Sequence, residues 1–277
     1  MNLARLLKTD EAKPEAGFSS AGVVMELNGV HRVHEGPNGP LTTLQNVSFS
    51  VRSGEILCIL GPSGCGKSTL LNMMAGLDTP TLGTVKLKGR TVTGPGADRV
   101  VIFQEAALFP WLTIAENVEF GLRIKGVSAG ERRDRAITVL EMVHLKEFAG
   151  AYPHQLSGGM KQRAALARGL VLDPEILLMD EPFAALDAQT RDILHGEVQD
   201  IWKKTKKTIV LVTHNVREAA CLGHRILLLT ARPGRVKKEY TVDLPMPRAI
   251  EDSRVVEVTR EVLHDLKEEV RPKPDSN

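Results

Sequence analysis

The sequence predicts an α/β fold in which a parallel sheet carries a phosphate-binding loop, with an antiparallel β layer and a helical subdomain added to it. A glycine-rich loop at residues 61–69 lies between a buried strand and a helix. Three more apolar runs, at 100–103, 176–180 and 208–213, each end in or are followed by a polar residue, as strands of a parallel sheet do beside a binding site. Earlier runs alternate in polarity, and residues 105–165 have helical patterns.

Composition and charge restrict the function classes. The chain has 277 residues, 42% of them hydrophobic, and a formal net charge of +2, which gives no strong field for nucleic acid. The cysteines Cys58, Cys65 and Cys221 form no disulfide framework and indicate a reducing, cytosolic compartment. No apolar run approaches the ~18 residues of a membrane span, and the first residues are too charged for a secretory signal. A membrane role therefore needs a partner.

The glycine-rich loop is the most specific motif. Its glycines allow a tight turn that points successive N–H groups into one concavity, at the positive end of the following helix, where an anion is favoured. Lys67 adds a charge toward the outer phosphates, and the Ser68 hydroxyl is placed to hold Mg²⁺. A plain turn with a solvated lysine is the alternative, but the flanking strand and helix argue against it. The predicted nucleotide-binding residues are Gly61, Pro62, Ser63, Gly64, Cys65, Gly66, Lys67, Ser68 and Thr69.

The elements around this loop follow in order. Residues 1–21 are expected to form a flexible extension with one helical turn, and 22–245 the main domain. Residues 246–277 form a C-terminal tail with a final amphipathic helix. Alternating runs predict antiparallel strands at 23–27, 44–51 and 83–89.

Polar residues at the ends of the apolar runs mark a site. Gln104, Asp180 and His214 end or follow these runs, and Glu181 comes next after Asp180. Because ligands of parallel sheets lie beyond the carboxyl ends of the strands, we expect these residues to converge with the phosphate loop. Ser157 stands where the N-cap of the next helix is expected.

Taken together, these motifs resemble the ATP-binding subunit of ABC transporters over residues 24–230. The resemblance implies a RecA-like ATPase core that binds ATP and Mg²⁺. More narrowly, residues 95–99, 109–113 and 242–245 look like the nitrate, sulfonate, taurine and bicarbonate importer group. The motifs that carry the family resemblance are the phosphate loop, Gln104, Leu156–Arg163, Asp180–Pro182, Ala184–Asp187 and His214.

The resemblance assigns roles to four of these residues. Asp180 resembles the second magnesium carboxylate, acting through water, and Glu181 the catalytic glutamate that orients or deprotonates the attacking water. Gln104 resembles the glutamine that senses Mg²⁺ and the γ-phosphate, and His214 the switch histidine on that phosphate. By itself each has a structural alternative, such as a sheet-end acid, a solvated glutamate, a surface glutamine or a structural histidine.

The signature residues imply a dimer. In the family, the residues matching Ser157, Gly158 and Gly159 bind the γ-phosphate of the ATP held by the other subunit. The resemblance therefore implies a head-to-tail homodimer, or a heterodimer with a close homologue, around two ATP molecules. Asp187 would lie at that interface. Met160 stands where many members have glutamine, with little effect expected.

Two places leave alternatives open. The family stacks an aromatic side chain on adenine at the position of His34, which is otherwise a loop histidine. Phe109, Pro110 and Trp111 either pack in the core of the helical subdomain or form the groove for a coupling helix of a membrane subunit.

The function implied is an ATPase subunit that powers solute import. Its partners would be integral membrane permease subunits and a solute-binding protein, and its place the cytoplasmic face of the inner membrane. The solute would be an anion such as nitrate, sulfonate, taurine or bicarbonate. A soluble ABC ATPase acting on nucleic acid or ribosomes is the rival, but a single phosphate loop, no heptad run and near-neutral charge argue against it. The signature motif argues against a plain phosphate-loop kinase or GTPase.

Overall fold

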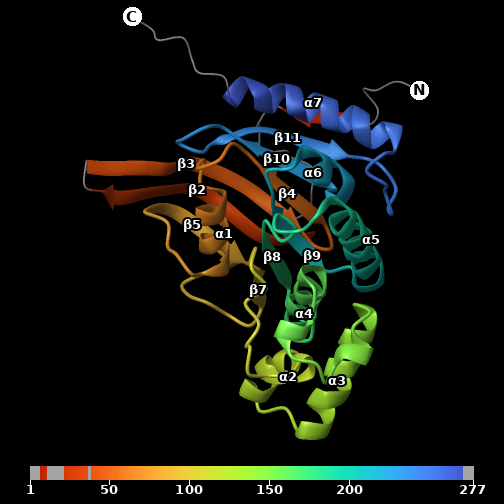
Figure 1. Ribbon diagram of the computed structural model, residues 1–277. Helices are drawn as coiled ribbons and strands as arrows, with labels where there is room; N and C mark the ends of the chain where they lie inside the picture. The colour runs from red at the N-terminus through yellow and green to blue at the C-terminus, as the bar shows by residue number, and fades with distance from the viewer. Residues whose placement is uncertain (1–6, 11–21, 37–38, 271–277) are drawn as a thin grey trace, which may run out of the picture. The chain divides into compact units, whose positions relative to one another are not determined.

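The computed structural model describes residues 7–10, 22–36 and 39–270 (Figure 1). The chain separates into a first unit, residues 1–95 and 207–277, and a second unit, Gly96–Lys206. This division differs from the one expected from the sequence. The second unit is larger than the helical subdomain predicted at 105–165, and the C-terminal tail belongs to the first unit.

An antiparallel sheet in the first unit confirms the predicted β layer. Its strand order is β3-β2-β5-β6. Met25 pairs with Val51 and Leu27 with Phe49, so the pleat directs alternate side chains to the core. Met25, Leu27 and Val51 are buried. The strands are β2 (Val23–Gly36), β3 (Gly39–Arg52), β5 (Leu82–Leu87) and β6 (Arg90–Thr91).

A second sheet of the first unit carries the phosphate loop. Its three parallel strands are buried at every position, as expected for strands covered on both faces. β10 pairs with β4 and β4 with β9, while β11 is antiparallel to β10. The carboxyl ends of β4 and β9 are therefore neighbours. The strands are β4 (Ile56–Leu60), β9 (Thr208–Val212), β10 (Arg225–Leu229) and β11 (Val236–Val242).

The N-terminal extension differs from expectation where the structure describes it. Leu7–Asp10 form the strand β1, antiparallel to β11, in place of a flexible segment with a helical turn. The available edge of β11 supplies backbone partners that a short polar sequence does not announce. The other residues of the predicted extension lie outside the described ranges.

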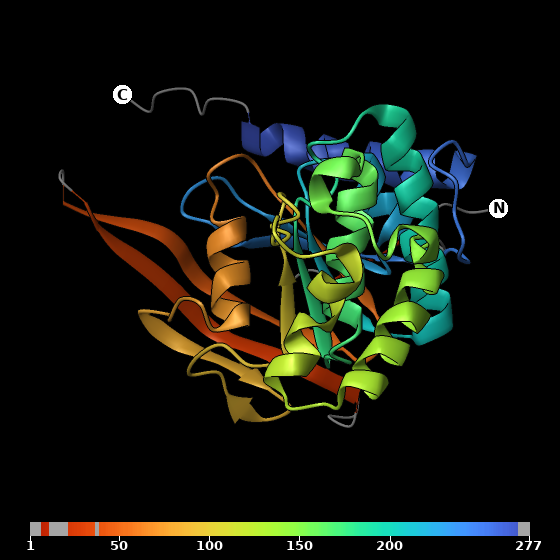
Figure 2. The ribbon, with the colours of Figure 1, turned by 60° about the horizontal axis from the view of Figure 1, so that its bottom comes forward.

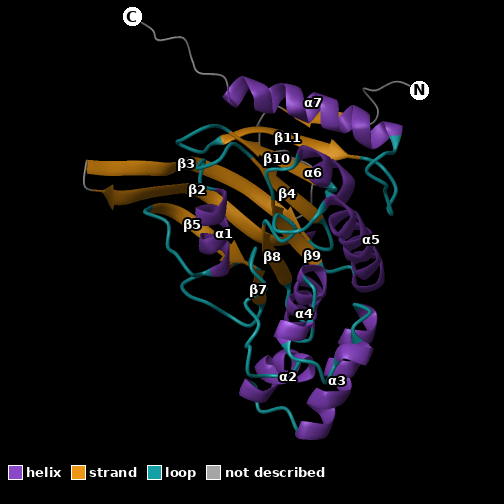
Figure 3. Ribbon diagram, viewed as in Figure 1, coloured by secondary structure: helices purple, strands orange, loops and turns teal. Residues whose placement is uncertain are grey.

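The described part of the first unit also contains the helices α1 (Lys67–Ala75), α6 (Val216–Leu222) and α7 (Ser253–Val270). α7 is the predicted amphipathic helix, with Val255, Val258 and Val262 buried. It packs against α6 and runs along β11 (Figure 3). Lys238 of β11 binds Asp265 of α7 at 2.8 Å. Of the helices in the described ranges, none is both long enough and apolar enough to cross a bilayer.

The second unit joins two parallel strands to a group of helices. β7 (Arg99–Ile102) pairs with β8 (Ile176–Asp180) in the predicted parallel sense. Helices α2 and α3 lie beside each other (Figure 2), and both contact α4. The helix α5 was not predicted. The helices are α2 (Ile114–Ile124), α3 (Ala129–Met142), α4 (Gly158–Leu170) and α5 (Ala188–Thr205).

Candidate functional site

The phosphate loop connects β4 to α1 through the tight turn predicted for it. Gly64 and Gly66 have φ of 75° and 102°, in the left-handed region that only glycine adopts without steric cost. A Cβ at Gly66 would lie 2.8 Å from Leu44 Cδ2, and one at Gly61 2.7 Å from Cys65 Sγ. Left-handed backbone and close packing thus account for all three glycines.

Lys67 opens α1 and turns its side chain back along the loop. Its Nζ donates to Gly61 O at 2.9 Å and Pro62 O at 3.1 Å, and the residue is 7% exposed. The N-cap Gly66 makes no side-chain capping bond, so the helix opens on main-chain N–H groups. Helix dipole, loop amides and a held ammonium together suit the phosphate groups of a nucleotide.

Cys65 behaves as a packing residue within this loop. Burial raises the pKa of its thiol above the ordinary value, although Lys67 opposes the shift. The side chain is 1% exposed and stays protonated at neutral pH. Cys58, Cys65 and Cys221 are all buried.

His214 lies at the same sheet edge of the first unit as the phosphate loop. Ile59 of β4 pairs with Val212 of β9, and Thr213 N donates to Ile59 O at 3.2 Å. His214, the next residue, is exposed. The predicted convergence of the loop and this histidine on one edge is therefore confirmed.

Hydrogen bonds on both sides fix the turn that presents His214. The Thr213 hydroxyl donates to the buried Glu218 carboxylate and accepts from Asn215 N at 3.0 Å. The Asn215 side chain in turn caps α6 by accepting from Arg217 N at 3.0 Å. Glu218 had not been singled out from the sequence, where its only signal is a carboxylate four residues after His214 at the start of a helix whose remaining turn is apolar.

A matching edge in the second unit brings Gln104, Asp180 and Glu181 together. Ile102 of β7 pairs with Met179 of β8, so the residues beyond these strands share one edge. Gln104 is exposed, whereas Asp180 and Glu181 are half-buried. Glu181 has φ of 46°, a left-handed conformation that costs a non-glycine residue roughly 1–2 kcal/mol. Such strain is typical of functional positions.

The signature residues open α4, as the sequence predicted. Ser157 is the N-cap, and its Oγ accepts from Met160 N at 3.3 Å. Ser157 and Gly158 are exposed, while Gly159 is buried. A Cβ at Gly159 would lie 2.6 Å from Thr190 Cγ2, so this glycine lets the start of α4 approach α5 closely.

Asp187 has a structural role in this chain. It is the N-cap of α5, and its Oδ1 accepts from Thr190 N at 3.0 Å. Hydrogen bonding with Thr190 lowers the pKa of the exposed Asp187 carboxyl below its ordinary value. An Asp at the N-cap is a typical helix start signal, but α5 was not predicted from it.

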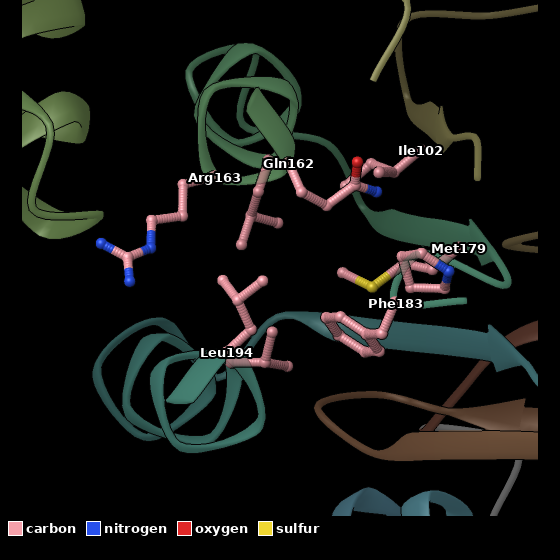
Figure 4. A pocket seen from close by; sticks show the side chains of 9 residues that line it. Ile102, Gln162, Arg163, Met179, Phe183 and Leu194 are labelled. Carbon is pink, nitrogen blue, oxygen red and sulfur yellow. The ribbon is translucent and has the colours of Figure 1, made fainter. Parts of the chain in front are cut away.

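A narrow internal gap lies between β7, β8, α4 and α5 (Figure 4). Its volume of ≈ 10 Å³ corresponds to about one water molecule, so it is a packing gap between these elements. Gln162 of α4 points toward Ile102 in this view, and its Nε2 donates to Phe103 O at 3.1 Å. The signature helix therefore holds the residue immediately before Gln104.

The aromatic segment after β7 has a half-buried Phe109 and an exposed Trp111, and the two interpretations left open stay predictions. Phe109 packs on Phe120, with ring centroids 4.6 Å apart, and Asn117 binds the backbone N–H and C=O of Phe109 at 2.8 and 3.1 Å. Phe109 is half-buried, so these contacts hold it within the helical subdomain without burying it fully in a core. Trp111 is 71% exposed. A hollow of ≈ 280 Å³ beside Phe109 is lined by residues that include Val101, Phe120, Arg168 and Leu172.

His34 lies in a strand, so the alternative of a loop histidine is wrong. It belongs to β2, pairs with Leu41 of β3 and is half-buried. The strand continues to Gly36, well beyond the run at 23–27 that predicted it. Stacking of His34 on adenine stays a prediction.

The comparisons with known proteins agree with these motifs. A family described as ABC transporter matches residues 44–184, about half of the chain. The nitrate import ATP-binding protein NrtD of Synechocystis sp. is 47% identical over 86% of this chain and 89% of its own length. The chain belongs to the ABC transporter family.

Further similarities support this ABC cassette. The taurine import ATP-binding protein TauB of Jannaschia sp. is 44% identical over 87% of this chain and 94% of its own. A solved dimeric ATP-binding cassette, in a post-hydrolysis state bound to ADP and Pi, is 35% identical, with a TM-score of 0.69 over 80% of this chain and 100% of its own. The α/β fold and the ABC resemblance predicted from the sequence are therefore confirmed.

Replacement of Lys67 by alanine tests the phosphate loop of this ABC cassette. We expect MgADP affinity to fall about 10- to 100-fold, because the variant loses a charged donor to the phosphates. Alanine has a high helix propensity, so the variant should still begin α1 at this residue. Isothermal titration measures the affinity, and Lys204→Ala on an exposed face of α5 is the matched control. Unchanged affinity in Lys67→Ala would contradict the assignment.

Proposed function

We propose that the chain is the ATP-hydrolysing subunit of an ABC importer. The main support is the occurrence in one chain of the phosphate loop with its held Lys67 and of the signature residues at the exposed start of α4. Relatives named as nitrate and taurine import ATP-binding proteins align over most of the chain. These names favour the importer over the soluble ABC ATPase that acts on nucleic acid or ribosomes.

Each site residue has a proposed role in hydrolysis. The loop amides and Lys67 would bind the phosphates, and Ser68 and Asp180 would hold Mg²⁺. Bound Mg²⁺·ATP supplies the phosphoanhydride bond and the charge neutralisation that its cleavage needs. Glu181 orients or deprotonates the attacking water. Gln104 and His214 read the outer phosphate.

The active form in this proposal is a dimer around two ATP molecules. Ser157, Gly158 and Gly159 offer a hydroxyl and the open end of α4 to the outer phosphate held by the other subunit. Asp187, exposed at the start of the neighbouring helix α5, would lie near that contact. The similarity to a dimeric cassette bound to ADP and Pi supports this arrangement.

Membrane-spanning permease subunits would be the partners, with a solute-binding protein delivering the solute. The exposed Trp111 beside the hollow near Phe109 provides apolar surface for a permease segment. The subunit would then lie on the cytoplasmic face of the inner membrane. The relatives' names favour an anion such as nitrate, sulfonate, taurine or bicarbonate as the solute.

Purification of the chain from detergent-solubilised native membranes tests this proposal. We expect a multi-span membrane protein to co-purify with the wild type, and to be lost from Trp111→Ala. Val256→Ala, at another exposed apolar residue 42% accessible on α7, is the matched control and should retain the partner. A solute-binding protein recovered with the complex would be titrated with nitrate, bicarbonate and taurine. Recovery only with ribosomes or DNA would contradict the transport function.

A further inference from the structure

The basic turn between β10 and β11 touches the phosphate loop. Arg232 Nε donates to Gly64 O at 3.0 Å. A Cβ at Gly64 would lie 3.0 Å from Arg232 Nη2, so the guanidinium also lies close to the left-handed residue of the loop. The two residues are 168 positions apart in the sequence. The turn therefore brings a permanent positive charge and a directed hydrogen bond to the exposed part of the loop.

Gly234 presses the same turn against the base of the loop. A Cβ at this position would lie 2.2 Å from Cys65 O, a distance that no side chain could occupy. Gly234 N donates to Thr43 O at 2.9 Å, and Gly234 O accepts from Gln45 N at 2.9 Å. The backbone of Gly234 thus anchors the turn on β3 and packs it against the loop, so that Arg232 stays within reach of Gly64.

Helix α7 holds the turn from its other end. A Glu269 carboxylate oxygen accepts from Ala231 N at 3.0 Å, directly beside Arg232. Lys237 Nζ binds Glu269 at 2.9 Å, and Glu269 is half-buried. Within the turn, the Thr230 hydroxyl donates to Pro233 O and accepts from Arg235 N, both at 3.0 Å. A continuous set of contacts therefore runs from α7 to the phosphate loop, entirely within the first unit.

We propose that Arg232 is a positioning residue of the nucleotide site, and that Glu269 of α7 sets its place and so couples the C-terminal helix to nucleotide affinity. A loop that is already ordered loses less conformational entropy when phosphate binds. Arg232 orders the loop through a backbone carbonyl, so the gain is shared by ATP and ADP. The inference rests on the proposed binding of ATP at this loop.

Substitutions at Arg232 test the positioning role in the full chain. Isothermal titration with MgADP and with the Mg²⁺ complex of a non-hydrolysable ATP analogue gives both affinities. For Arg232→Ala we expect both to fall about tenfold, the scale of a lost charge-assisted hydrogen bond. Arg232→Lys should recover part of the loss, because it keeps the charge without the planar guanidinium.

Arg235→Ala is the matched control, since it removes the same charge from the same turn. Arg235 Nε binds Gln45 Oε1 at 3.0 Å, and within the described part of the chain its side chain makes no hydrogen bond to the phosphate loop. Its affinities should stay within about twofold of the wild type, because an exposed charge acts weakly at a distance. An equal loss in both alanine variants would show a general charge effect and overturn the positioning role. Wild-type affinity in Arg232→Ala would overturn it as well.

A second pair of variants tests the link to α7. Glu269→Ala should weaken both nucleotides about threefold, while the melting temperature of the nucleotide-free protein stays close to that of Glu268→Ala. Glu268 also binds Lys237, at 3.0 Å, but among the described residues its side chain has no hydrogen bond to the turn, which makes it the matched control. Equal affinities in these two variants would overturn the coupling. Failure of the wild type to bind nucleotide would instead reject the proposed function, so the two failures are distinguishable.

Discussion

Replacement of Glu181 by glutamine is expected to reduce ATP turnover by a factor of about 10²–10⁴ while nucleotide binding persists. The amide keeps the size of the side chain but cannot accept a proton from the attacking water. Glu181 follows β8 directly and is half-buried, a setting that suits a positioned base. Because the cleavage step alone is blocked, the ATP-bound dimer should accumulate.

The backbone conformation of Glu181 suggests a second variant, which should lose activity without losing stability. Its φ of 46° is strained for glutamate and also for glutamine. Glycine accepts this conformation, so Glu181→Gly should be at least as stable as the wild type although it loses turnover. Loss of activity would then be separated from loss of structure.

Phosphate release and size-exclusion chromatography with ATP measure these effects. Glu147→Gln, which changes an exposed glutamate of the same unit, is the control and should turn over normally. Rapid turnover by Glu181→Gln would remove this residue from the proposed mechanism. Loss of nucleotide binding in the same variant would show instead that Glu181 helps to bind the nucleotide before cleavage.

Replacement of Arg225 by methionine is expected to destabilise the first unit by about 3–5 kcal/mol. Arg225 is 3% exposed and binds Glu55 and Glu239, each at 2.7 Å. It also donates to Ser50 O at 3.1 Å, which ties β10 to β3. Methionine fills a similar volume but leaves the Glu55 carboxylate, itself 7% exposed, without its counter-charge.

The loss of stability in Arg225→Met should depend on pH. Burial already raises the pKa of Glu55 above its ordinary value, and Arg225 is the main opposing influence. Without Arg225 the pKa of Glu55 rises further. An acid whose pKa is higher in the folded state binds more protons there, so stability falls as pH rises above its unfolded pKa of about 4.3. The deficit should therefore be smaller at acidic pH than at pH 8.

Thermal unfolding followed by circular dichroism measures this loss of stability, which should lower the melting temperature by roughly 10 °C. The double variant Arg225→Met, Glu55→Gln should recover part of it, because the unpaired charge is gone. Arg217→Met, at an exposed arginine of α6, should change stability by less than about 0.5 kcal/mol. A deficit that is the same at all pH values would exclude the unpaired Glu55 charge as its cause.

Local rules explain why much of the candidate site could be predicted from the sequence. The phosphate loop needs glycine at Gly64 and Gly66 because of their left-handed backbone, and Ser157 announces α4 because a hydroxyl caps its open amides. Uninterrupted apolar runs placed β4, β8 and β9 within a residue or so of their observed limits. These signals act over a few residues, so a single sequence contains them.

The tertiary structure alone decided which polar and charged residues pair with each other. Arg232 reaches Gly64 across 168 positions, and Arg225 reaches Glu55 across 170. β1 forms only because β11 has an edge with which it can pair. Such partners depend on strand order and register, which charge and hydropathy patterns leave open. The sequence by itself thus determined the nucleotide loop and its family, whereas the contacts that hold the loop, from Arg232 and α7, required the folded chain.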